Sequence, residues 1–311
     1  MSKRILYLFT RTPLHVGAGA SVGAIDQPIV RERHTGFPVI PASSLKGTFA
    51  DAWNGELLEE TNSRGEMKKV RVTRDGIASD AAWLFGSDSD RHASAGALQF
   101  SEARLLAFPI RSAKGSFAWI TCPLMLQRAV RDGVIPQTLL DGLIEPNEGQ
   151  ALFDTSNTGK LNLGSRLVLE EYTFQHSDWS GLPKISTALG GLLDADPVWQ
   201  EVQHRLVILG NGMMSFFAKS ACEFAQHVRI SDETGTAEEG ALFNQENVPS
   251  ESMFYAILYG MDERTPKRID DTRRNAATAL EAFAGKTNGR IFQFGGDAST
   301  GLGYCTVRLS N

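Results

Sequence analysis

The chain has 311 residues, 42% of them hydrophobic, which is enough to bury a core in one large domain or two small ones. A formal net charge of −5 argues against a protein whose whole surface binds nucleic acid. The apolar run at residues 5–9 is too short for a signal peptide or a membrane span, and no later run approaches about 18 residues. We therefore expect a cytoplasmic protein with no membrane partner. The scattered cysteines at 122, 222 and 305 predict neither a zinc site nor a disulfide framework.

Positive charge is concentrated at the amino-terminal end of the chain. Residues 1–50 contain six Lys or Arg against Asp26 and Glu32, so this segment carries +4 and the remainder carries −9. A basic face on an acidic body suits a subunit that grips RNA with one surface and leaves the rest for solvent or neighbours. The alternative is a chance fluctuation, and charge alone does not decide between the two.

The first half of the chain predicts a short series of strands and helices. The strands are expected over residues 4–10, 97–108 and 116–121, the last two as an antiparallel pair. One helix should run from about Ser44 to Trp53, and another from Pro123 to about Arg131, since proline is tolerated in a first helical turn. Residues 55–94 are polar and charged, so they predict an insertion outside the core.

The second half predicts more strands and two further helices. The strands are expected over residues 166–174, 206–209, 253–259, 290–294 and 304–309. Asn211 is a candidate cap for a helix over residues 213–221. The clearest helix pattern begins at Thr265–Pro266 and ends at Gly285, with its apolar residues on one stripe.

A projecting hairpin is predicted near residue 235. Residues 223–230 and 241–243 have strand character and flank 232–236, a turn sequence of Asp, Glu, Thr, Gly and Thr. Across the whole chain, strands interleave with two principal helices and include antiparallel pairs. This arrangement indicates an α+β domain.

The stretch from residue 13 to residue 47 combines features that suit contact with a phosphate-bearing polymer. A loop with Gly17, Gly19 and Gly23 has little side-chain bulk and can adopt positive φ, so a polymer backbone could approach it closely. Asp26 is the carboxylate of this loop, and a basic run with Arg31 and Arg33 follows it. The negative charge of Asp26 would repel the phosphate that the arginines attract. Its position among glycines and before arginines therefore favours a role in the chemistry over a purely structural one.

The same stretch ends at the start of the first predicted helix. A serine in the N-cap position, at Ser43 or Ser44, is expected to open this helix. The amides and the positive dipole end of a helix N-terminus attract phosphate, and Lys46 in the first turn would add a point charge.

Several motifs closely resemble a known family. They are residues 15–19, 25–36, 40–47, 96–112, 233–236, 240–243 and 295–303. This set resembles the RAMP-superfamily backbone ribonuclease subunit of type III-B CRISPR effector (Cmr) complexes. The resemblance spans nearly the whole chain, and its early motifs are specific.

The resemblance implies a fold that composition alone would not select. It implies a single RAMP domain over residues 1–311, with a modified ferredoxin-like (RRM-like) palm. It also implies a fingers insertion at about 55–95 and a β-hairpin thumb at about 222–249.

The resemblance also implies a function in antiviral defence. Such a subunit binds CRISPR guide RNA and cleaves complementary single-stranded target RNA at regular intervals. It stacks head to tail with other copies of itself, between other Cmr subunits. The alternatives that remain open are a non-catalytic guide-RNA scaffold of the same fold, and a metabolic enzyme whose glycine loop binds a mononucleotide phosphate.

Asp26 is the candidate residue for cleavage and for holding a metal. RNA carries its own nucleophile, the 2′-hydroxyl, so cleavage needs in-line geometry and help with proton transfer and charge. A lone carboxylate is a weak base, and we expect it to act through Mg²⁺ or Mn²⁺. A two-metal mechanism is disfavoured, because the sequence shows no cluster of carboxylates. The simpler alternative is that Asp26 only forms a turn.

Two further residues are candidates for assisting cleavage. His15 precedes the glycine loop and could act as an acid or contact phosphate, although such a histidine is more often structural. Glu246 remains from an acidic and aromatic stretch that the family carries in its thumb. The residues predicted to bind RNA are Gly17, Gly19, Arg31, Arg33, His34, Ser43, Ser44, Lys46, Gly295, Gly296, Gly301 and Gly303. For the basic residues the alternative is a solvated strand face, and for the late glycines it is an ordinary tight turn.

Overall fold

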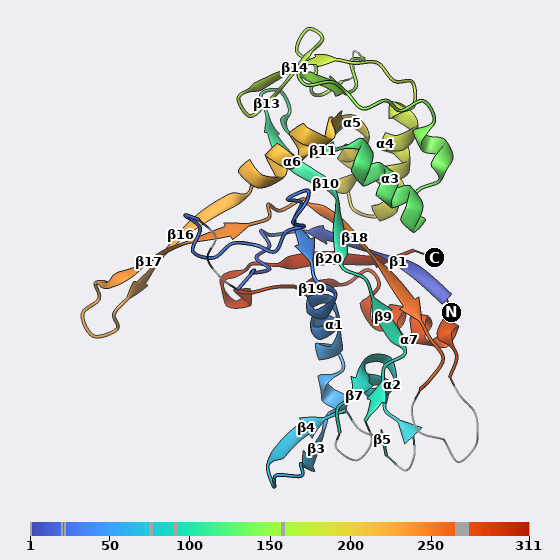
Figure 1. Ribbon diagram of the computed structural model, residues 1–311, viewed down its shortest axis with the longest axis vertical. Coiled ribbons are helices and arrows are strands. Elements are labelled where there is room, and N and C mark those ends of the chain that lie inside the picture. Colours follow the sequence, from blue (N-terminus) through green and yellow to red (C-terminus); the bar gives the residue numbers. More distant parts are fainter. Residues whose placement is uncertain are drawn as a thin grey trace.

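The structure is a computed structural model that describes residues 2–310 apart from 20, 22, 72, 75–76, 90–92, 157–158 and 265–273. Strands and helices alternate along the chain, in agreement with the predicted α+β class. A long mixed sheet crosses the middle of the molecule and continues into an upper lobe, while a hairpin projects to one side (Figure 1). No helix of the described residues is long and apolar enough to cross a membrane.

The central part of the sheet is antiparallel. Its strands lie in the order β10 (Ala103–Ser112), β18 (Met253–Gly260), β1 (Ser2–Thr10), β20 (Tyr304–Leu309) and β19 (Ile291–Gln293). Two short strands join it, β2 (Val39–Ile40) beside β10 and β9 (Leu98–Phe100) beside β18. Helix α1 (Ala42–Asp51) follows β1 in the chain, and helix α7 (Ala276–Thr287) follows β18. The strands predicted for this part of the chain are present, except that the single strand expected over residues 97–108 is two strands, β9 and β10.

Both faces of the central sheet are buried, and strand β1 shows why. Successive side chains of a strand point to opposite faces, so Leu6 and Leu8 pack on one side with Phe49 of α1. On the other side Phe9 packs edge to face on Trp199, with ring centroids 5.4 Å apart. The all-apolar sequence of residues 5–9 therefore forms a strand that is covered on both faces.

The segment predicted as an insertion is only partly outside the core. Its hairpin of β3 (Leu58–Thr61) and β4 (Met67–Val70) extends away from the sheet (Figure 1). Helix α2 (Asp80–Phe85) behaves differently, because residues 81–85 are all buried in the core that also contains Phe49. The expectation that the whole segment avoids the core is therefore wrong for α2. The remaining short strands are β5 (Thr73–Arg74), β6 (Ile77–Ala78), β7 (Gly86–Ser87) and β8 (Ser94–Ala95).

The upper lobe extends the sheet beyond β10. Its strands are β11 (Ser116–Thr121), β15 (Leu206–Leu209), β12 (Gln150–Leu152), β14 (Tyr172–His176) and β13 (Arg166–Leu169), in this spatial order. Its helices are α3 (Pro123–Asp132), α4 (Leu182–Gly190), α5 (Val202–Arg205) and α6 (Asn211–Ser220). The single strand predicted at 166–174 is in fact the hairpin of β13 and β14, because Glu170 adopts a left-handed φ of 50° and turns the chain.

Three predicted helix starts differ from the structure. Helix α1 has Pro41 at its N-cap and no side-chain cap, so the predicted serine cap is wrong. Asn211 does not cap α6 either, because its side chain bonds Glu145 and the Leu124 amide. Helix α7 is capped by Asn275, so it begins later than predicted, and the predicted start at 265–266 lies outside the described residues.

The predicted hairpin is present. Strands β16 (Glu223–Ile230) and β17 (Ala237–Asn247) pair with each other in a sheet of their own and project from the body (Figure 1). Strand β17 is longer than expected and reaches back to the central sheet. It joins that sheet through the turn that leads into β18.

Candidate active site

Three segments that are distant in sequence meet where the hairpin joins the body. They are the loop at residues 11–30, the end of β17 at residues 244–247, and the loop at residues 295–303. We call residues 244–247 the hairpin base. The Glu246 amide donates to the Gln27 carbonyl at 3.0 Å, and the Gly296 amide donates to the His15 carbonyl at 2.9 Å. The two glycine-rich loops are therefore joined to each other and to the hairpin base.

Asp26 is held by Asn244 of the hairpin base. The Asn244 amide donates to Asp26 Oδ2 at 2.9 Å, and the Asp26 amide donates to Asn244 Oδ1 at 2.9 Å. The Asn244 side-chain nitrogen also donates to the Ala24 carbonyl at 3.0 Å. Asp26 remains exposed to solvent, and no hydrogen bond to its Oδ1 occurs within the described residues. The loop therefore presents one carboxylate oxygen outward from a fixed backbone.

Gln245 connects the hairpin base to the second glycine-rich loop. Its side chain is 1% exposed, and its Nε2 donates to Asp297 Oδ2 at 2.5 Å. Its Oε1 lies 2.9 Å from His227 Nε2 across the hairpin. Because an amide oxygen can only accept, the histidine nitrogen is the donor in this contact.

Glu246 forms an internal ion pair with Arg31. Glu246 is 2% exposed, its Oε1 lies 2.5 Å from Arg31 Nη2, and its Oε2 accepts from the Ile29 amide. Arg31 also donates to the carbonyls of Gly36 and Ala218. A charge this deeply buried needs such a partner, and removal of one partner typically costs about 3–5 kcal/mol. The geometry gives both residues a role in joining the loop to the hairpin, whereas cleavage by Glu246 and RNA contact by Arg31 remain predictions.

His15, in the first loop, contacts the hairpin base and the second loop. Its Nδ1 lies 2.8 Å from the Glu246 carbonyl, so Nδ1 carries the donated proton. The ring is 7% exposed and lies against Gly17 and Gly296. These contacts favour the structural interpretation of His15 over a direct role in cleavage.

The glycines of the two loops serve different purposes. Gly295 has φ of +77°, and a Cβ there would lie 2.0 Å from the His15 carbonyl oxygen. Gly303 has φ of +81°, and a Cβ there would lie 1.9 Å from the Phe294 carbonyl oxygen. These two residues are glycine because the chain's own backbone passes close by. Gly19 and Gly301 face open space, so a polymer could approach the loops at those positions.

A basic turn lies next to this cluster. Arg33 and His34 are exposed at the tip of residues 32–36, and the Lys219 side chain of α6 crosses directly over Gly36. An ion pair holds the turn against helix α3: Arg128 Nη1 lies 2.9 Å from Glu32 Oε2. Burial raises the pKa of Glu32, but hydrogen bonds from Thr35 and Arg128 more than offset this, and the net pKa is lowered.

The helix residues predicted to bind phosphate are not bonded to the loops. Within the described part of the chain, no hydrogen bond or ion pair joins Ser43, Ser44 or Lys46 to the loops or to the hairpin base. Desolvation, and then the charge of Arg71 in the segment after β4, lower the pKa of Lys46. Lys46 therefore lies toward the β3–β4 hairpin, and its contact with RNA remains a prediction.

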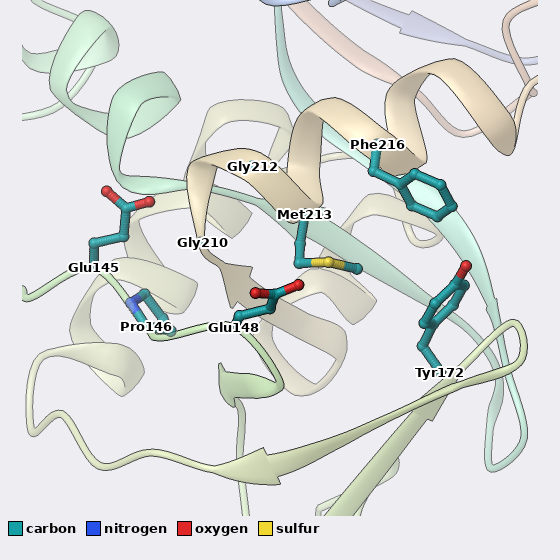
Figure 2. Close-up of a pocket in the computed structure, with 8 residues that line it drawn as sticks. All are labelled: Glu145, Pro146, Glu148, Tyr172, Gly210, Gly212, Met213 and Phe216. Atoms are coloured by element: carbon teal, nitrogen blue, oxygen red, sulfur yellow. The ribbon is translucent and has the colours of Figure 1, made fainter.

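A separate cavity of about 560 Å³ opens between α6 and β14 (Figure 2). Tyr172 and Phe216 form one wall with ring centroids 5.4 Å apart, and Glu148 and Met213 approach from the other side. None of its lining residues belongs to the two glycine-rich loops or to the hairpin base. Sequence reasoning did not identify it, because its walls come from elements that are distant in the chain.

Comparison with known proteins identifies the family. A model of the RAMP superfamily matches residues 8–306. The chain is 31% identical over 315 residues to CRISPR system Cmr endoribonuclease Cmr4 of Pyrococcus furiosus, and the match covers 99% of this chain and 96% of the relative. The chain belongs to the RAMP superfamily and, within it, to the Cmr4 family. The predicted family resemblance is thereby confirmed.

Other Cmr4 proteins and structures agree with this membership. The CMR subunit Cmr4 of Saccharolobus solfataricus is 24% identical over 327 residues, covering 96% of this chain and 94% of the relative. The crystal structure of oligomeric Cmr4 from P. furiosus has a TM-score of 0.66 and 23% identity, covering 100% of this chain and 98% of that one. A chain in the cryo-EM structure of type III-B Cmr-β bound to cognate target RNA has a TM-score of 0.68 and 20% identity, covering 99% and 97%. These structural likenesses show a shared Cmr4 fold.

Two side chains at this Cmr4-family site were not predicted. Asn244 belongs to the stretch of the hairpin from which only Glu246 was selected, and nothing in the sequence linked it to Asp26. Lys219 is a basic residue in the last turn of α6, but its approach to residues 32–36 depends on tertiary packing.

Proposed function

We propose that this chain is the backbone subunit of a type III-B CRISPR RNA-guided effector complex, which binds guide RNA and cleaves complementary target RNA at regular intervals. The observation that carries the proposal is an exposed Asp26 in the first glycine-rich loop, fixed by Asn244 of the hairpin base, in a chain whose match covers 96% of an endoribonuclease. The biological role is antiviral defence by destruction of the target RNA.

The strand topology supports the assignment of palm and thumb. The chain order β1, α1, β10, β18, α7, β20 gives a sheet ordered β10, β18, β1, β20, in which all neighbours are antiparallel. This is the βαββαβ arrangement of a ferredoxin-like palm. The hairpin of β16 and β17 is the thumb, and the β3–β4 hairpin belongs to the fingers.

The proposed chemistry uses the nucleophile of the RNA itself. A target nucleotide displaced beside the thumb brings its 2′-hydroxyl in line with the adjacent phosphate. The 2′-oxygen bonds to phosphorus to form a cyclic phosphate, while the bond to the 5′-oxygen breaks and that oxygen takes a proton from water. Asp26 assists by accepting the proton of the 2′-hydroxyl as that group attacks. The open space at Gly19 and Gly301 lets the RNA backbone reach the carboxylate.

A divalent cation, Mg²⁺ or Mn²⁺, belongs to this proposal as an expectation. The described residues contain no group of three His, Cys, Asp or Glu side chains that could hold a metal. Mg²⁺ often binds through one carboxylate, several waters and substrate phosphates, and Asp26 can supply that carboxylate. When bound, such a cation would neutralise charge on the phosphate and favour ionisation of the hydroxyl.

The proposed RNA contacts are with the backbone. Arg33 and His34 of the basic turn and Lys219 of α6 lie close together beside the loops, and these side chains suit phosphate rather than base edges. Copies of the chain would stack head to tail along the guide RNA. A heterologous interface of this kind continues until a different subunit caps it, so other Cmr subunits are expected at the ends.

The rival proposal is a scaffold with the same fold that binds guide RNA without cutting the target. A reconstituted guide complex with Asp26→Ala separates the two. We expect guide binding to be retained and single-turnover cleavage to fall at least about 100-fold, typical for loss of a group that assists proton transfer. Asp178→Ala, at an exposed aspartate of the upper lobe, is the matched control. Undiminished cleavage by the Asp26→Ala complex would leave the scaffold as the better account of this residue.

A further inference from the structure

The hairpin base holds a different segment of the body with each of three successive residues. Asn244 bonds the loop at Ala24 and Asp26, Gln245 bonds Asp297, and Glu246 bonds Arg31. Side chains of a strand alternate between its two faces, so the base reaches segments on both sides at once. The end of β17 is therefore the element through which the hairpin and the two loops are positioned relative to one another.

We propose that Asn244 is the positioning residue for Asp26, which sets the direction of the carboxylate toward the scissile phosphate. This inference rests on the proposed function. Asn244 uses its main chain and its side chain for different tasks. Its amide holds the Asp26 carboxylate at Oδ2, while its side chain holds the loop backbone at the Asp26 amide and the Ala24 carbonyl.

The loop needs this restraint because its own sequence does little to fix its backbone conformation. Residues 23, 24 and 26 are exposed, and Gly23 has a left-handed φ of +62°, where a Cβ would meet no atom within 4 Å. Such a segment samples many backbone conformations in the absence of a partner. Four hydrogen bonds to Asn244 restrict these conformations, the fourth from the Gln27 amide to the Asn244 carbonyl at 3.1 Å. Displacement of a reacting group by about 1 Å can cost on the order of 100-fold in rate.

The same arrangement connects cleavage to the thumb. Asp26 takes its orientation from the base of a thumb strand and not from the palm sheet. Asn244 is neutral, so it can approach the carboxylate without like-charge repulsion. Its counterpart across the hairpin, Gln226, is exposed, and its side chain makes no hydrogen bond within the described residues.

The test compares Asn244→Ala with Gln226→Ala in the reconstituted guide complex. We expect Asn244→Ala to lower the single-turnover cleavage rate by about 10-fold to 100-fold, with target affinity within about twofold of wild type. Gln226→Ala should leave both quantities unchanged. Asn244→Asp preserves the shape and the acceptor for the Asp26 amide but cannot donate to the Ala24 carbonyl, so it should also be slow. A residue that merely stabilised the thumb would lower affinity and rate together.

A double variant decides whether Asn244 acts through Asp26. In an Asp26→Ala background, the further change Asn244→Ala should not lower the residual rate, because the group that it orients is already absent. Wild-type rates in both Asn244 variants, or effects of Asp26→Ala and Asn244→Ala that multiply, would overturn the inference. If Asp26→Ala alone leaves cleavage intact, the proposed function of Asp26 fails instead, so the two failures are distinguishable.

Discussion

Two Arg–Glu ion pairs involve the hairpin, one buried at its base and one exposed toward its tip. At its base, Glu246 and Arg31 lie 2.5 Å apart with side chains 3% and 18% exposed. Toward its tip, Glu238 and Arg229 lie 3.6 Å apart with side chains 41% and 73% exposed. The inner pair joins two segments that are distant in sequence, whereas the outer pair only spans the two strands of the hairpin.

The two ends of the hairpin therefore have different roles. The base is part of the body, since residues 245–247 are all buried, and Gln245 and Glu246 are hydrogen-bonded to the loops. The outer part exposes Val228, Ile230 and Leu242, at 48%, 50% and 67%. Apolar side chains on an isolated two-stranded hairpin suit contact with another molecule. The base therefore positions the site, and the tip is left free to meet RNA or a neighbouring copy.

The largest expected difference is in stability. Glu246→Ala leaves Arg31 buried without its counter-charge, so the free energy of unfolding should fall by about 3–5 kcal/mol. Glu238→Ala removes only an exposed pair and should change it by less than about 1 kcal/mol. Urea unfolding of the two variants measures both values. Equal effects would show that the base is no more integrated with the body than the tip.

Deletion of the tip should change the cleavage pattern and leave stability nearly unchanged. Among the described residues, removal of 231–239 breaks no hydrogen bond to the body, so stability and guide binding should stay close to wild type. If the thumb displaces the nucleotide, evenly spaced target cleavage should be lost or blurred. Gel analysis of the products, with Glu238→Ala as the control, measures this. The same ladder of products from the deletion variant would mean that the loops alone set the register.

A smaller effect is expected where the hairpin rejoins the central sheet. Burial and the negative charge of Asp196, opposed by Arg11, raise the pKa of Glu251 from 4.5 to about 7. A raised folded-state pKa contributes stability that is fully present below about pH 4.5 and is lost as the pH rises through 7. Glu251→Gln should therefore stabilise the protein by about 1–2 kcal/mol at pH 8 and by little at pH 5. Denaturant titrations of both proteins at the two pH values test this, and an advantage that does not depend on pH would contradict it.

The smallest effects concern the basic turn beside the base. Arg33→Ala and Lys219→Ala should each weaken guide-RNA binding and flatten its salt dependence by roughly 0.7 in log–log slope, for any RNA sequence. Lys184→Ala, at an exposed lysine of α4, should leave the slope unchanged. Arg31 differs from these residues, because its guanidinium is bonded internally and its substitution should act through stability. If the salt dependence of binding is unchanged in both variants, these side chains face solvent and do not contact RNA.

The sequence predicted elements whose signals are local. The turn at 232–236 and the apolar run at 5–9 were sufficient for the hairpin and for β1. The start of α1 was missed because Pro41, and not a serine, occupies the N-cap. The association of Asp26 with Asn244 was not predictable, because the two are 218 positions apart and neither sequence context refers to the other. For the same reason Arg31 was taken for a surface cation, although Glu246, 215 positions away, neutralises it.

The central claim is that each copy cuts the target at its own position with its own Asp26. Guide complexes assembled from mixtures of wild-type and Asp26→Ala chains test it, with the intensity of each product band followed as the mutant fraction increases. We expect every band to weaken in proportion to the mutant fraction, with no change in position, and cleavage to disappear when all copies are mutant. Bands that keep their full intensity until almost every copy is mutant, or a complete ladder from all-mutant complexes, would contradict it.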